Sequence, residues 1–482
     1  MLEAIDYKKI FTYFEEISNV PRGSYHNEKI SEYLVQFAKD HGFSYRVDDA
    51  RNVIIKKPAC GKTASRDAVM LQGHMDMVCV SEGVSHDFLT EGLSLRVEGD
   101  HICADGTTLG GDDGIALAYM LALLDGDGYT HPPIEAVFTV DEEVGMNGAA
   151  ALDVSDLEAK RLINIDNEEE GQLLVSCAGG ARAQVEFTGS REKRKGTFLE
   201  VSVSGLAGGH SGTEIGKHPF NASILLGRIL AETFETHPFL LRSFQGGDKD
   251  NVITNAAAAH IYCEGQAEEL SGCLSEFAVR LTEELRSQEP DMTVEVGKPE
   301  TKEDFCFDRA FTDAVLTFMD LTISGVQVYS GDIPGMVESS LNMGVAKTDE
   351  SGIVLGFAVR SQKKSYKEHM LFQLRRLAAC AAKAGCGHSF QTSGDYPEWD
   401  YKQDSHLREV MVREFRECFG KEPRVEGIHA GLECGMLAEK IPGLDIVSFG
   451  PDIQDIHTVR ERMSISSAKR NFDFLIRVLE KL

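Results

Sequence analysis

The sequence lacks any uninterrupted apolar run of the ~18 residues or more that a membrane span requires. Its 11 cysteines are odd in number, scattered, and never spaced as Cys-x-x-Cys. This excludes both a disulfide framework and a thiolate zinc site, and it favours a reducing compartment. Residues 1–9 show neither the basic and apolar pattern of a secretory signal nor an Arg-rich transit pattern. We therefore expect a cytoplasmic protein with no membrane association.

Basic residues are also fewer than acidic residues in this sequence. The chain has 49 Lys and Arg residues against 77 Asp and Glu residues, which gives a formal net charge of −28. Such a charge opposes binding to nucleic-acid phosphates and to anionic lipid surfaces. With 482 residues, the chain exceeds the roughly 250 to 300 residues at which a single core stops growing. Two or more domains are expected.

The N-terminal third alternates helical and strand-like patterns. Apolar residues spaced three and four apart predict helices over residues 7–17 and 30–38, and an apolar helix is expected over 115–124. Short apolar runs predict strands at 52–56, 68–72, 134–140 and 162–165. This alternation predicts an α/β domain in which helices flank a mainly parallel central sheet.

The pattern changes after about residue 185. Strand-like runs flank the charged turn 191–196, and amphipathic helices are expected over 274–285 and 370–381. Near residue 396 the first pattern returns, closing with a strand at 446–449 and a helix at 472–479. We predict a first domain of residues 1–185 and 396–482 and an inserted α+β domain of residues 186–395. The inserted domain could consist of two tandem halves.

Polar residues capable of metal chemistry follow several of the predicted strands. His74 ends one strand and Asp76 follows it, so the imidazole could bind a metal while the carboxylate orients the ring. A surface histidine beside an unrelated aspartate is the competing interpretation. The Gly-rich segment 107–114 offers Asp112 before a helix, although a calcium loop or a simple helix cap would use the same residues.

Acidic residues also follow the next two strands. Glu142 and Glu143 can divide two tasks, one coordinating a metal and the other accepting a proton from water. Asp166 follows the strand at 162–165, and we expect the glutamates after it, at 168–170, to form a solvated loop. His457 lies several residues after the strand at 446–449. Ligands bind at strand C-termini in open α/β sheets, so these groups should converge.

Two histidines with three carboxylates suit zinc, while cobalt or manganese could use the same nitrogen and oxygen ligands. Calcium prefers oxygen ligands and would leave both histidines unexplained. The sequence therefore predicts a transition-metal site at the sheet edge.

Six segments together resemble a known family: 20–24, 72–78, 107–114, 141–146, 208–212 and 429–435. They are similar to the co-catalytic zinc aminopeptidase and carboxypeptidase clan, and within it to the aminoacyl-histidine dipeptidases, also called cytosolic non-specific dipeptidases. The resemblance covers nearly the whole chain. It implies a zinc-peptidase catalytic domain with an inserted lid domain, two Zn²⁺ per subunit, and dipeptide substrates.

The resemblance also implies residue roles. Two zinc ions would be held by His74, Asp112, Glu143, Asp166 and His457, with Asp112 bridging them and the peptide bond after Asp112 in the cis form. Asp76 would orient His74, and Glu142 would act as the general base.

In the inserted domain, His210 would stabilise the oxyanion, unless it is an interface histidine. Arg360 would bind the substrate carboxylate, with Asn251 as a weaker candidate. Glu433 belongs to a family segment near the site and has no assigned role.

Two segments depart from the family pattern, 111–113 and 217–222, so substrate preference could have drifted. We predict cleavage of unblocked dipeptides, including Xaa-His. Aspartate at position 166 favours this over the carboxypeptidases and acyl-amino-acid hydrolases, in which the matching ligand is usually glutamate. The alternatives are an N-acyl-amino-acid amidohydrolase with the same metal centre and a non-catalytic peptide-binding protein. The sequence leaves monomer and homodimer open.

Overall fold

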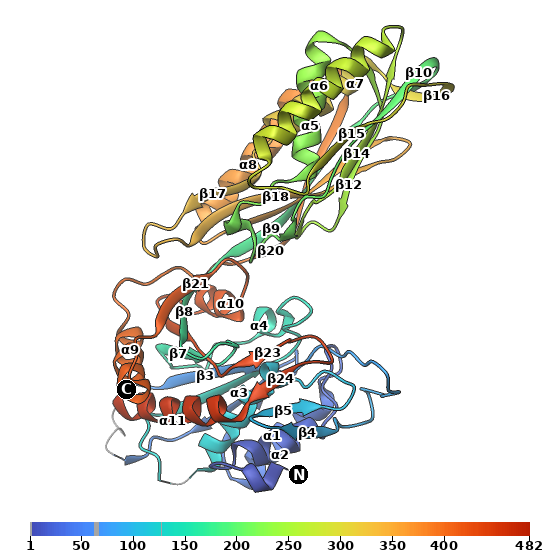
Figure 1. Ribbon diagram of the computed structural model, residues 1–482. Helices are drawn as coiled ribbons and strands as arrows, with labels where there is room; N and C mark the ends of the chain where they lie inside the picture. The colour runs from blue at the N-terminus through green and yellow to red at the C-terminus, as the bar shows by residue number, and fades with distance from the viewer. Residues whose placement is uncertain (1, 62–66, 127) are drawn as a thin grey trace. The chain divides into compact units, whose positions relative to one another are not determined.

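A computed structural model describes residues 2–61, 67–126 and 128–482. The chain divides into two compact units (Figure 1). Unit 1 comprises Met1–Cys177, Trp399–Gly427 and Leu432–Leu482, and unit 2 comprises Ala178–Glu398 and Ile428–Gly431. Unit 2 thus begins at residue 178, where the sequence placed the boundary at 186, and it includes a short later segment that the sequence did not indicate.

Unit 1 is built on an eight-stranded sheet with the order β1-β2-β6-β3-β7-β22-β8-β21. Its central strands β6, β3, β7 and β22 are parallel, whereas β1, β2 and β8 pair antiparallel toward the edges. Both β3 and β6 are buried along their whole length, as expected for strands with both faces covered. The strands are β1 Ser44–Val47, β2 Val53–Lys57, β3 Val69–His74, β6 Ile134–Thr139, β7 Arg161–Asn164, β8 Gln172–Cys177, β21 Arg424–Ile428 and β22 Asp445–Ser448.

Helices cover this sheet. Helix α3 is buried over nearly its whole length and packs on β3, and α1 packs on α3. A second sheet has the order β23-β24-β5-β4. The helices are α1 Ile10–Ser18, α2 Glu28–Asp40, α3 Gly111–Asp125, α4 Asn147–Ala151, α9 His406–Phe419, α10 Glu433–Lys440 and α11 Ile465–Lys481, preceded by the 3-10 turn Leu2–Ile5. The small strands are β4 Leu95–Glu98, β5 His101–Ala104, β23 Ile453–Gln454 and β24 Arg462–Ser464.

Unit 2 contains a ten-stranded sheet with the order β15-β10-β14-β12-β18-β19-β9-β20, to which β16 and β17 pair through β10 and β18. Its strands are β9 Gly179–Thr188, β10 Arg191–Ser204, β12 Leu240–Asp248, β14 Ala257–Cys263, β15 Thr293–Val296, β16 Glu300–Phe307, β17 Gly325–Tyr329, β18 Val337–Thr348, β19 Gly352–Ser361 and β20 Gly387–Tyr396, with β11 Gly209–His210 and β13 Val252–Ile253 forming a separate pair.

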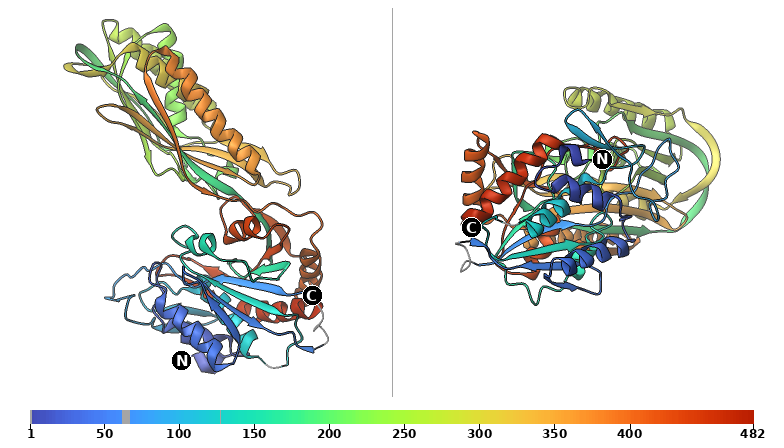
Figure 2. Two further views of the ribbon diagram at one scale, coloured as in Figure 1. Left: turned by 180° about the vertical axis from the view of Figure 1, so that it is seen from behind. Right: turned by 90° about the horizontal axis from the view of Figure 1, so that it is seen from below.

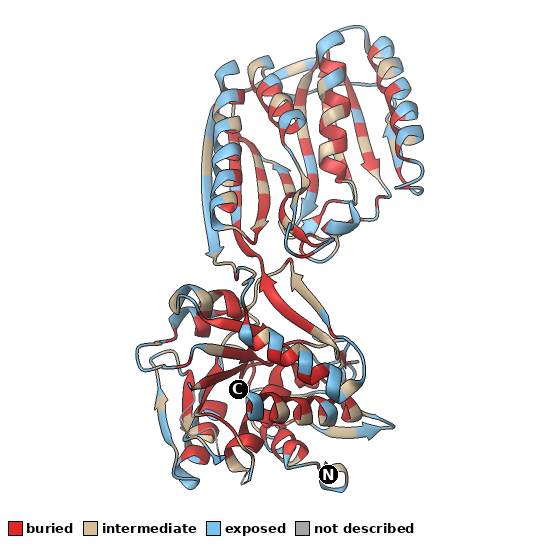
Figure 3. Cartoon of the chain, turned by 90° about the vertical axis from the view of Figure 1, so that its left-hand side faces the viewer, coloured by how far each residue is buried: buried red, intermediate tan, exposed pale blue. Residues whose placement is uncertain are grey.

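Four long helices lie on the unit 2 sheet, and Figure 2 (left) shows α8 lying lengthwise along it. They are α5 Ala222–Thr236, α6 Ala267–Leu285, α7 Arg309–Leu321 and α8 Lys364–Ala381, with 3-10 turns at Ile215–Lys217 and Ala382–Ala384. Buried and exposed residues alternate along these helices, as the colours in Figure 3 show. One apolar core spans all four helices. The elements that the sequence divided between two possible tandem halves thus lie on one sheet and around one core.

The predicted strands of unit 1 are confirmed to within two residues, whereas helices α6, α8 and α11 begin six or seven residues before the predicted positions. The prediction of a charged turn at 191–196 is wrong, because these residues belong to strand β10 and pair with β16, and the break between β9 and β10 falls at residues 189–190. The α/β character of unit 1 is confirmed as well, with antiparallel edges added to the parallel centre. Within residues 2–61, 67–126 and 128–482, none of the helices combines the length and the apolar character that crossing a bilayer requires.

Candidate metal centre

The predicted metal ligands of unit 1 converge because three parallel strands end side by side. Strand β3 lies between β6 and β7, with His74 opposite Thr139 and Gln72 opposite Asn164. The chain continues from β6 to Glu142 and Glu143, and from β7 to Asp166. The carboxyl ends of parallel strands share one edge of a sheet, where ligands bind.

Asp112 lies between the two predicted histidine ligands. Its Oδ1 is 3.0 Å from Nε2 of His74, and its Oδ2 is 3.2 Å from Nε2 of His457. His457 Nε2 is also 3.0 Å from Oε1 of Glu143, and His74 Nε2 is 3.6 Å from Oδ1 of Asp166. The structure thus brings together all five predicted ligands, with one carboxylate facing both imidazoles.

Among the residues that the structure describes, three groups of side chains offer ligand atoms that lie within 4.8 Å of one another. They are His74 with Glu142 and Glu143, His74 with Asp113 and Asp166, and Asp112 with Glu143 and His457. Each group combines one imidazole nitrogen with carboxylate oxygens, a donor set that fits zinc and also cobalt or manganese. The residues present therefore fit a centre of two metal ions.

The electrostatics of the cluster are those of a cation site. Burial alone would lower the pKa of His74, but its interactions with Asp112, Asp166 and Asp76 raise that pKa well above its ordinary value. Interactions with Asp112 and Glu143 raise the pKa of His457 to about 10. The carboxylates thus stabilise positive charge at this position, a role that bound metal cations would take over as they displace the protons.

Asp76 has the predicted contact with His74 and further contacts besides. Its backbone carbonyl lies 3.0 Å from Nδ1 of His74, closer than its carboxylate oxygen at 3.5 Å. The carboxylate also accepts hydrogen bonds from the amides of Glu142 and Glu143 at 3.0 and 3.4 Å, and from Oγ of Ser24 at 2.8 Å. The backbone of Asp76 therefore orients the imidazole, and its side chain fixes the loop that carries Glu142.

Glu142 is only partly exposed, beside the ligands. Burial, together with the negative charges of Asp166 and Glu433, raises the pKa of its carboxyl group well above the ordinary value of 4.5. A carboxylate with a raised pKa is a better proton acceptor near neutral pH than an exposed glutamate. This environment agrees with the role of general base predicted for Glu142.

The glutamates after Asp166 do not form the solvated loop that we expected. The Glu170 carboxylate contacts Oγ of Ser467 at 2.9 Å and Nε of Arg470 at 3.0 Å. Burial and the charges of Asp112 and Asp166 raise the pKa of Glu168 to about 8. The expectation is correct for Glu169 alone, which is exposed. Loop position in the sequence could not reveal these contacts, because they come from a distant helix.

A buried polar network lies beneath the ligands, and sequence reasoning missed it. Gln72 Nε2 and Thr139 Oγ1 donate to Glu433 Oε2 at 2.5 and 2.6 Å, and Asn164 Nδ2 donates to Gln72 Oε1 at 2.7 Å. Burial raises the pKa of Glu433 to about 7. Each of the three strand residues precedes a predicted ligand or base by a few positions. The available signal was a polar side chain inside each apolar strand.

The peptide bond between Asp112 and Asp113 is cis, as the family resemblance implied. Asp113 is buried, and its Oδ2 accepts a hydrogen bond from the His74 amide at 3.2 Å.

The other predicted site residues belong to unit 2. The backbone carbonyl of Asn251 accepts a hydrogen bond from Ser211 at 2.9 Å, next to His210 in the β11–β13 pair. Burial and the charge of Arg360 lower the pKa of His210. Arg360 Nη1 donates to Oη of Tyr396 at 2.8 Å. His210, Asn251 and Arg360 thus belong to one region of unit 2.

His429 joins this region from the later segment of unit 2. Its Nε2 lies 2.7 Å from Oγ of Ser340, and the residue is buried. Burial and the charge of Arg360 lower the pKa of His429 to about 3, which keeps the ring neutral.

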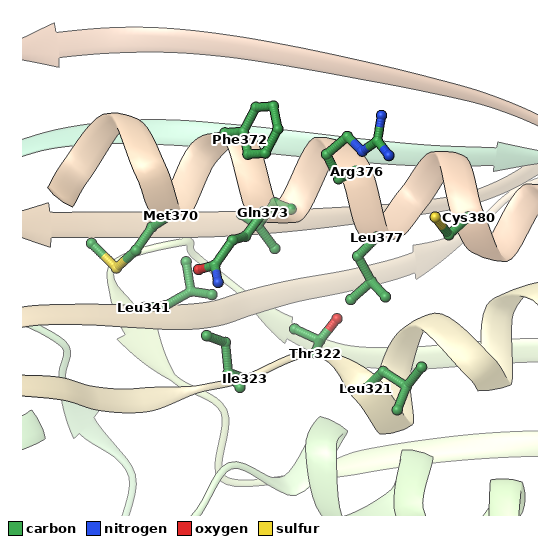
Figure 4. Close-up of a pocket in the computed structure, with 11 residues that line it drawn as sticks. Leu321, Thr322, Ile323, Leu341, Met370, Phe372, Gln373, Arg376, Leu377 and Cys380 are labelled. Atoms are coloured by element: carbon green, nitrogen blue, oxygen red, sulfur yellow. The ribbon is translucent and has the colours of Figure 1, made fainter. Parts of the chain in front are cut away.

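Unit 2 also has an apolar groove of about 390 Å³ between α7 and α8 (Figure 4). Leu321, Ile323, Leu341, Met370 and Leu377 contribute to its lining, together with Arg376. The lining lacks the imidazoles and carboxylates that the centre in unit 1 provides. The groove is therefore separate from the predicted chemistry.

Comparison with known proteins agrees with this geometry. Residues 70–481 match the peptidase family M20/M25/M40. The chain is 32% identical over 489 aligned residues to the cytosol non-specific dipeptidase of Escherichia coli, covering 100% of this chain and 99% of that protein. It superimposes with a TM-score of 0.94 on the crystal structure of aminoacylhistidine dipeptidase from Vibrio alginolyticus, at 32% identity and with 100% and 99% of the two chains covered. A Bacillus cereus aminopeptidase shares the fold at a TM-score of 0.59 and 17% identity, with 99% of each chain covered.

Proposed function

This chain belongs to peptidase family M20/M25/M40, and we propose that it is a cytoplasmic metallodipeptidase that cleaves unblocked dipeptides, Xaa-His among them. Two relatives that match over the full length are named as dipeptidases. One of them is named as a cytosol enzyme, which supports the location. The proposed metal is zinc, with cobalt or manganese as possible substitutes.

The position of Asp112 is the observation that carries this proposal. Its two oxygens lie 3.0 and 3.2 Å from the imidazoles of His74 and His457. A carboxylate shared in this way can serve two cations at once. Asp166 would complete the site of His74, and Glu143 would complete the site of His457. Two metal ions held there would polarise the scissile carbonyl and increase the acidity of a water molecule.

Glu142 would move the proton in this reaction. Its carboxylate would accept a proton from the attacking water and later deliver it to the leaving amine. Asp76 would hold the amides of Glu142 and Glu143, so that the base and its neighbouring ligand keep fixed positions. The division of tasks between adjacent glutamates separates metal binding from proton transfer.

Unit 2 would act as the lid that selects short substrates. Arg360 would pair with the substrate carboxylate through its guanidinium group, and His210 would donate a hydrogen bond to the developing oxyanion. Asn251 would contribute polar contacts beside His210. A clamp on the free carboxylate, carried by a lid that closes over the substrate, would favour dipeptides over longer peptides.

The proposal is tested by amino-acid release from unblocked dipeptides, tripeptides and N-acetyl amino acids. Chelated enzyme is assayed with and without added zinc, cobalt or manganese. Metal-dependent cleavage confined to unblocked dipeptides is the expected result. Cleavage of the acetylated compounds alone would indicate an N-acyl-amino-acid amidohydrolase. Bound metal without turnover of any substrate would indicate a peptide-binding protein.

A further inference from the structure

Two buried charged residues outside the predicted ligand set contact the loop that presents Asp112. Glu461 on one side and Arg22 on the other are 3% and 2% exposed. A buried charge is costly unless polar groups surround it. Both side chains find those groups in the backbone of residues 109–112 and its neighbours, and neither is explained by the proposed reaction.

Glu461 binds four consecutive amides. Its Oε2 accepts hydrogen bonds from Leu109 and Gly110 at 2.8 and 3.0 Å, and its Oε1 accepts from Gly111 and Asp112 at 2.7 and 3.4 Å. All four N–H groups thus point to one carboxylate. The last of them belongs to the residue whose side chain lies between His74 and His457.

Arg22 binds the carbonyl side of the same loop. Its Nη2 donates to the Gly110 carbonyl, and its Nη1 donates to the carbonyls of Met75 and Asp76 at 3.0 and 3.2 Å. The guanidinium group therefore links the Asp112 loop to the segment that directly follows His74. A planar fork with several donors suits such a task.

The glycines of the loop leave room for the guanidinium group. A Cβ atom at Gly110 would lie 2.5 Å from Nη2 of Arg22, and one at Gly114 would lie 2.7 Å from the same atom. Gly110 also adopts a φ of 63°, which a residue with a side chain rarely adopts. The Gly-rich turn noted in the sequence thus allows the close approach of Arg22.

We propose that Arg22 and Glu461 are positioning residues of the metal centre, which fix the backbone of Leu109–Asp112 and so set the place of the Asp112 carboxylate between His74 and His457. This rests on the proposed function, because it takes Asp112 to be a ligand shared by two metal ions. Residues that orient ligands without touching the metal affect metal affinity by roughly 10- to 100-fold.

The test compares Glu461→Gln with Glu135→Gln. Glu135 is a suitable control because it is also a buried glutamate of unit 1, and its carboxylate accepts amide hydrogen bonds from Glu158 and Ala159 at 3.0 to 3.1 Å. In Glu461→Gln, an NH₂ group would face two of the loop amides. Hydrogen exchange at residues 109–112 in chelated protein should then become faster by about tenfold or more, as expected for the loss of charged hydrogen bonds.

Metal titration of the same variants completes the test. Glu461→Gln should bind zinc roughly 10- to 100-fold more weakly than wild type, while Glu135→Gln should bind it normally. Arg22→Lys should show the same weakening, since an ammonium group cannot reproduce the fork. Equal zinc affinity in all variants, or equal losses in Glu461→Gln and Glu135→Gln, would overturn the proposal.

Folding failure has a defined meaning in this design. If Glu461→Gln and Arg22→Lys both fail to fold while Glu135→Gln folds, the pair serves fold stability and the proposal is wrong. If wild type binds no metal and cleaves no peptide, the proposed function fails. In that case, the hydrogen-exchange rates of residues 109–112 in chelated protein would still show whether Glu461 and Arg22 fix the backbone of this loop.

Discussion

The two units hold their candidate functional residues in different ways. In unit 1, the predicted ligands follow buried parallel strands. The buried Asp76 and Glu461 bind the loops that carry ligands, and the buried Glu433 binds the ends of strands β3 and β6. In unit 2, His210, Asn251 and Arg360 are only partly buried, and their side chains form few hydrogen bonds to neighbouring residues. The chemistry of unit 1 is thus preorganised, whereas the substrate contacts proposed for unit 2 can adapt.

Preorganisation predicts the largest effect for the base in unit 1. Glu142→Ala should retain metal and fold but lose about 10²- to 10⁴-fold in kcat, because proton transfer is lost while the ligands remain. Steady-state kinetics with metal analysis checks this. Glu169→Ala, a change at an exposed glutamate of unit 1, serves as a control and should be nearly normal. Full activity in Glu142→Ala would contradict the assignment.

A smaller and more selective effect is expected in unit 2. Arg360→Ala should raise KM about 10- to 100-fold for dipeptides with a free carboxylate, as expected for loss of a charged hydrogen bond. C-terminally amidated dipeptides should change little, since they offer no carboxylate to the guanidinium group. Kinetics on matched free and amidated substrates decides the point. An equal loss on both would exclude this contact.

Metal removal should lower the stability of unit 1 more than that of unit 2. A ligand that binds only the folded state stabilises it by about 2.7 kcal/mol at a concentration 100-fold above its Kd. Chelation should therefore destabilise unit 1, which contains the clusters around His74 and His457, and leave unit 2 nearly unchanged. Hydrogen exchange resolved by segment measures this. Equal destabilisation of both units would show that the metal site is not confined to unit 1.

The smallest effect is a pH dependence in unit 2. Burial first, and then Arg360, lowers the pKa of His429 to about 3 from the ordinary 6.5. As pH falls below 6.5, His429 therefore becomes protonated in the unfolded state but stays neutral in the folded state. Stability should fall by at most about 1.4 kcal/mol per pH unit between these values.

His429→Gln should reduce this pH dependence, and the exposed His388→Gln should not. Urea unfolding followed through unit 2 at pH 7 and pH 5 compares the variants. The same slope in His429→Gln as in wild type would show that another group is responsible.

Much of the metal centre was predictable because its ligands follow strands. His74, Glu143 and Asp166 each stand at or just after an apolar run, and apolar periodicity is visible in sequence. Strand direction at the sheet edges was not predictable, because an apolar run has no direction. The family resemblance, rather than periodicity, assigned the individual ligand roles.

The contacts of Asp76, Glu461 and Arg22 were hidden for a different reason. All three bind backbone atoms, and backbone groups are the same at every position of a sequence. Arg22 and Glu461 contact the same loop, although they lie near opposite ends of the sequence. Only the folded chain shows that Glu461 accepts from residues 109–112.

The strand order of unit 1 has a consequence for synthesis. Strand β22 inserts between β7 and β8, yet it follows all of unit 2 in the chain. Domains generally fold as units in the order in which they leave the ribosome. The contiguous part of unit 2 can therefore fold while the sheet of unit 1 still lacks its inner strand and while His457 has not been translated. A nascent chain would consequently lack the complete proposed metal centre, and with it the proposed peptidase activity, until all of unit 2 has been synthesised.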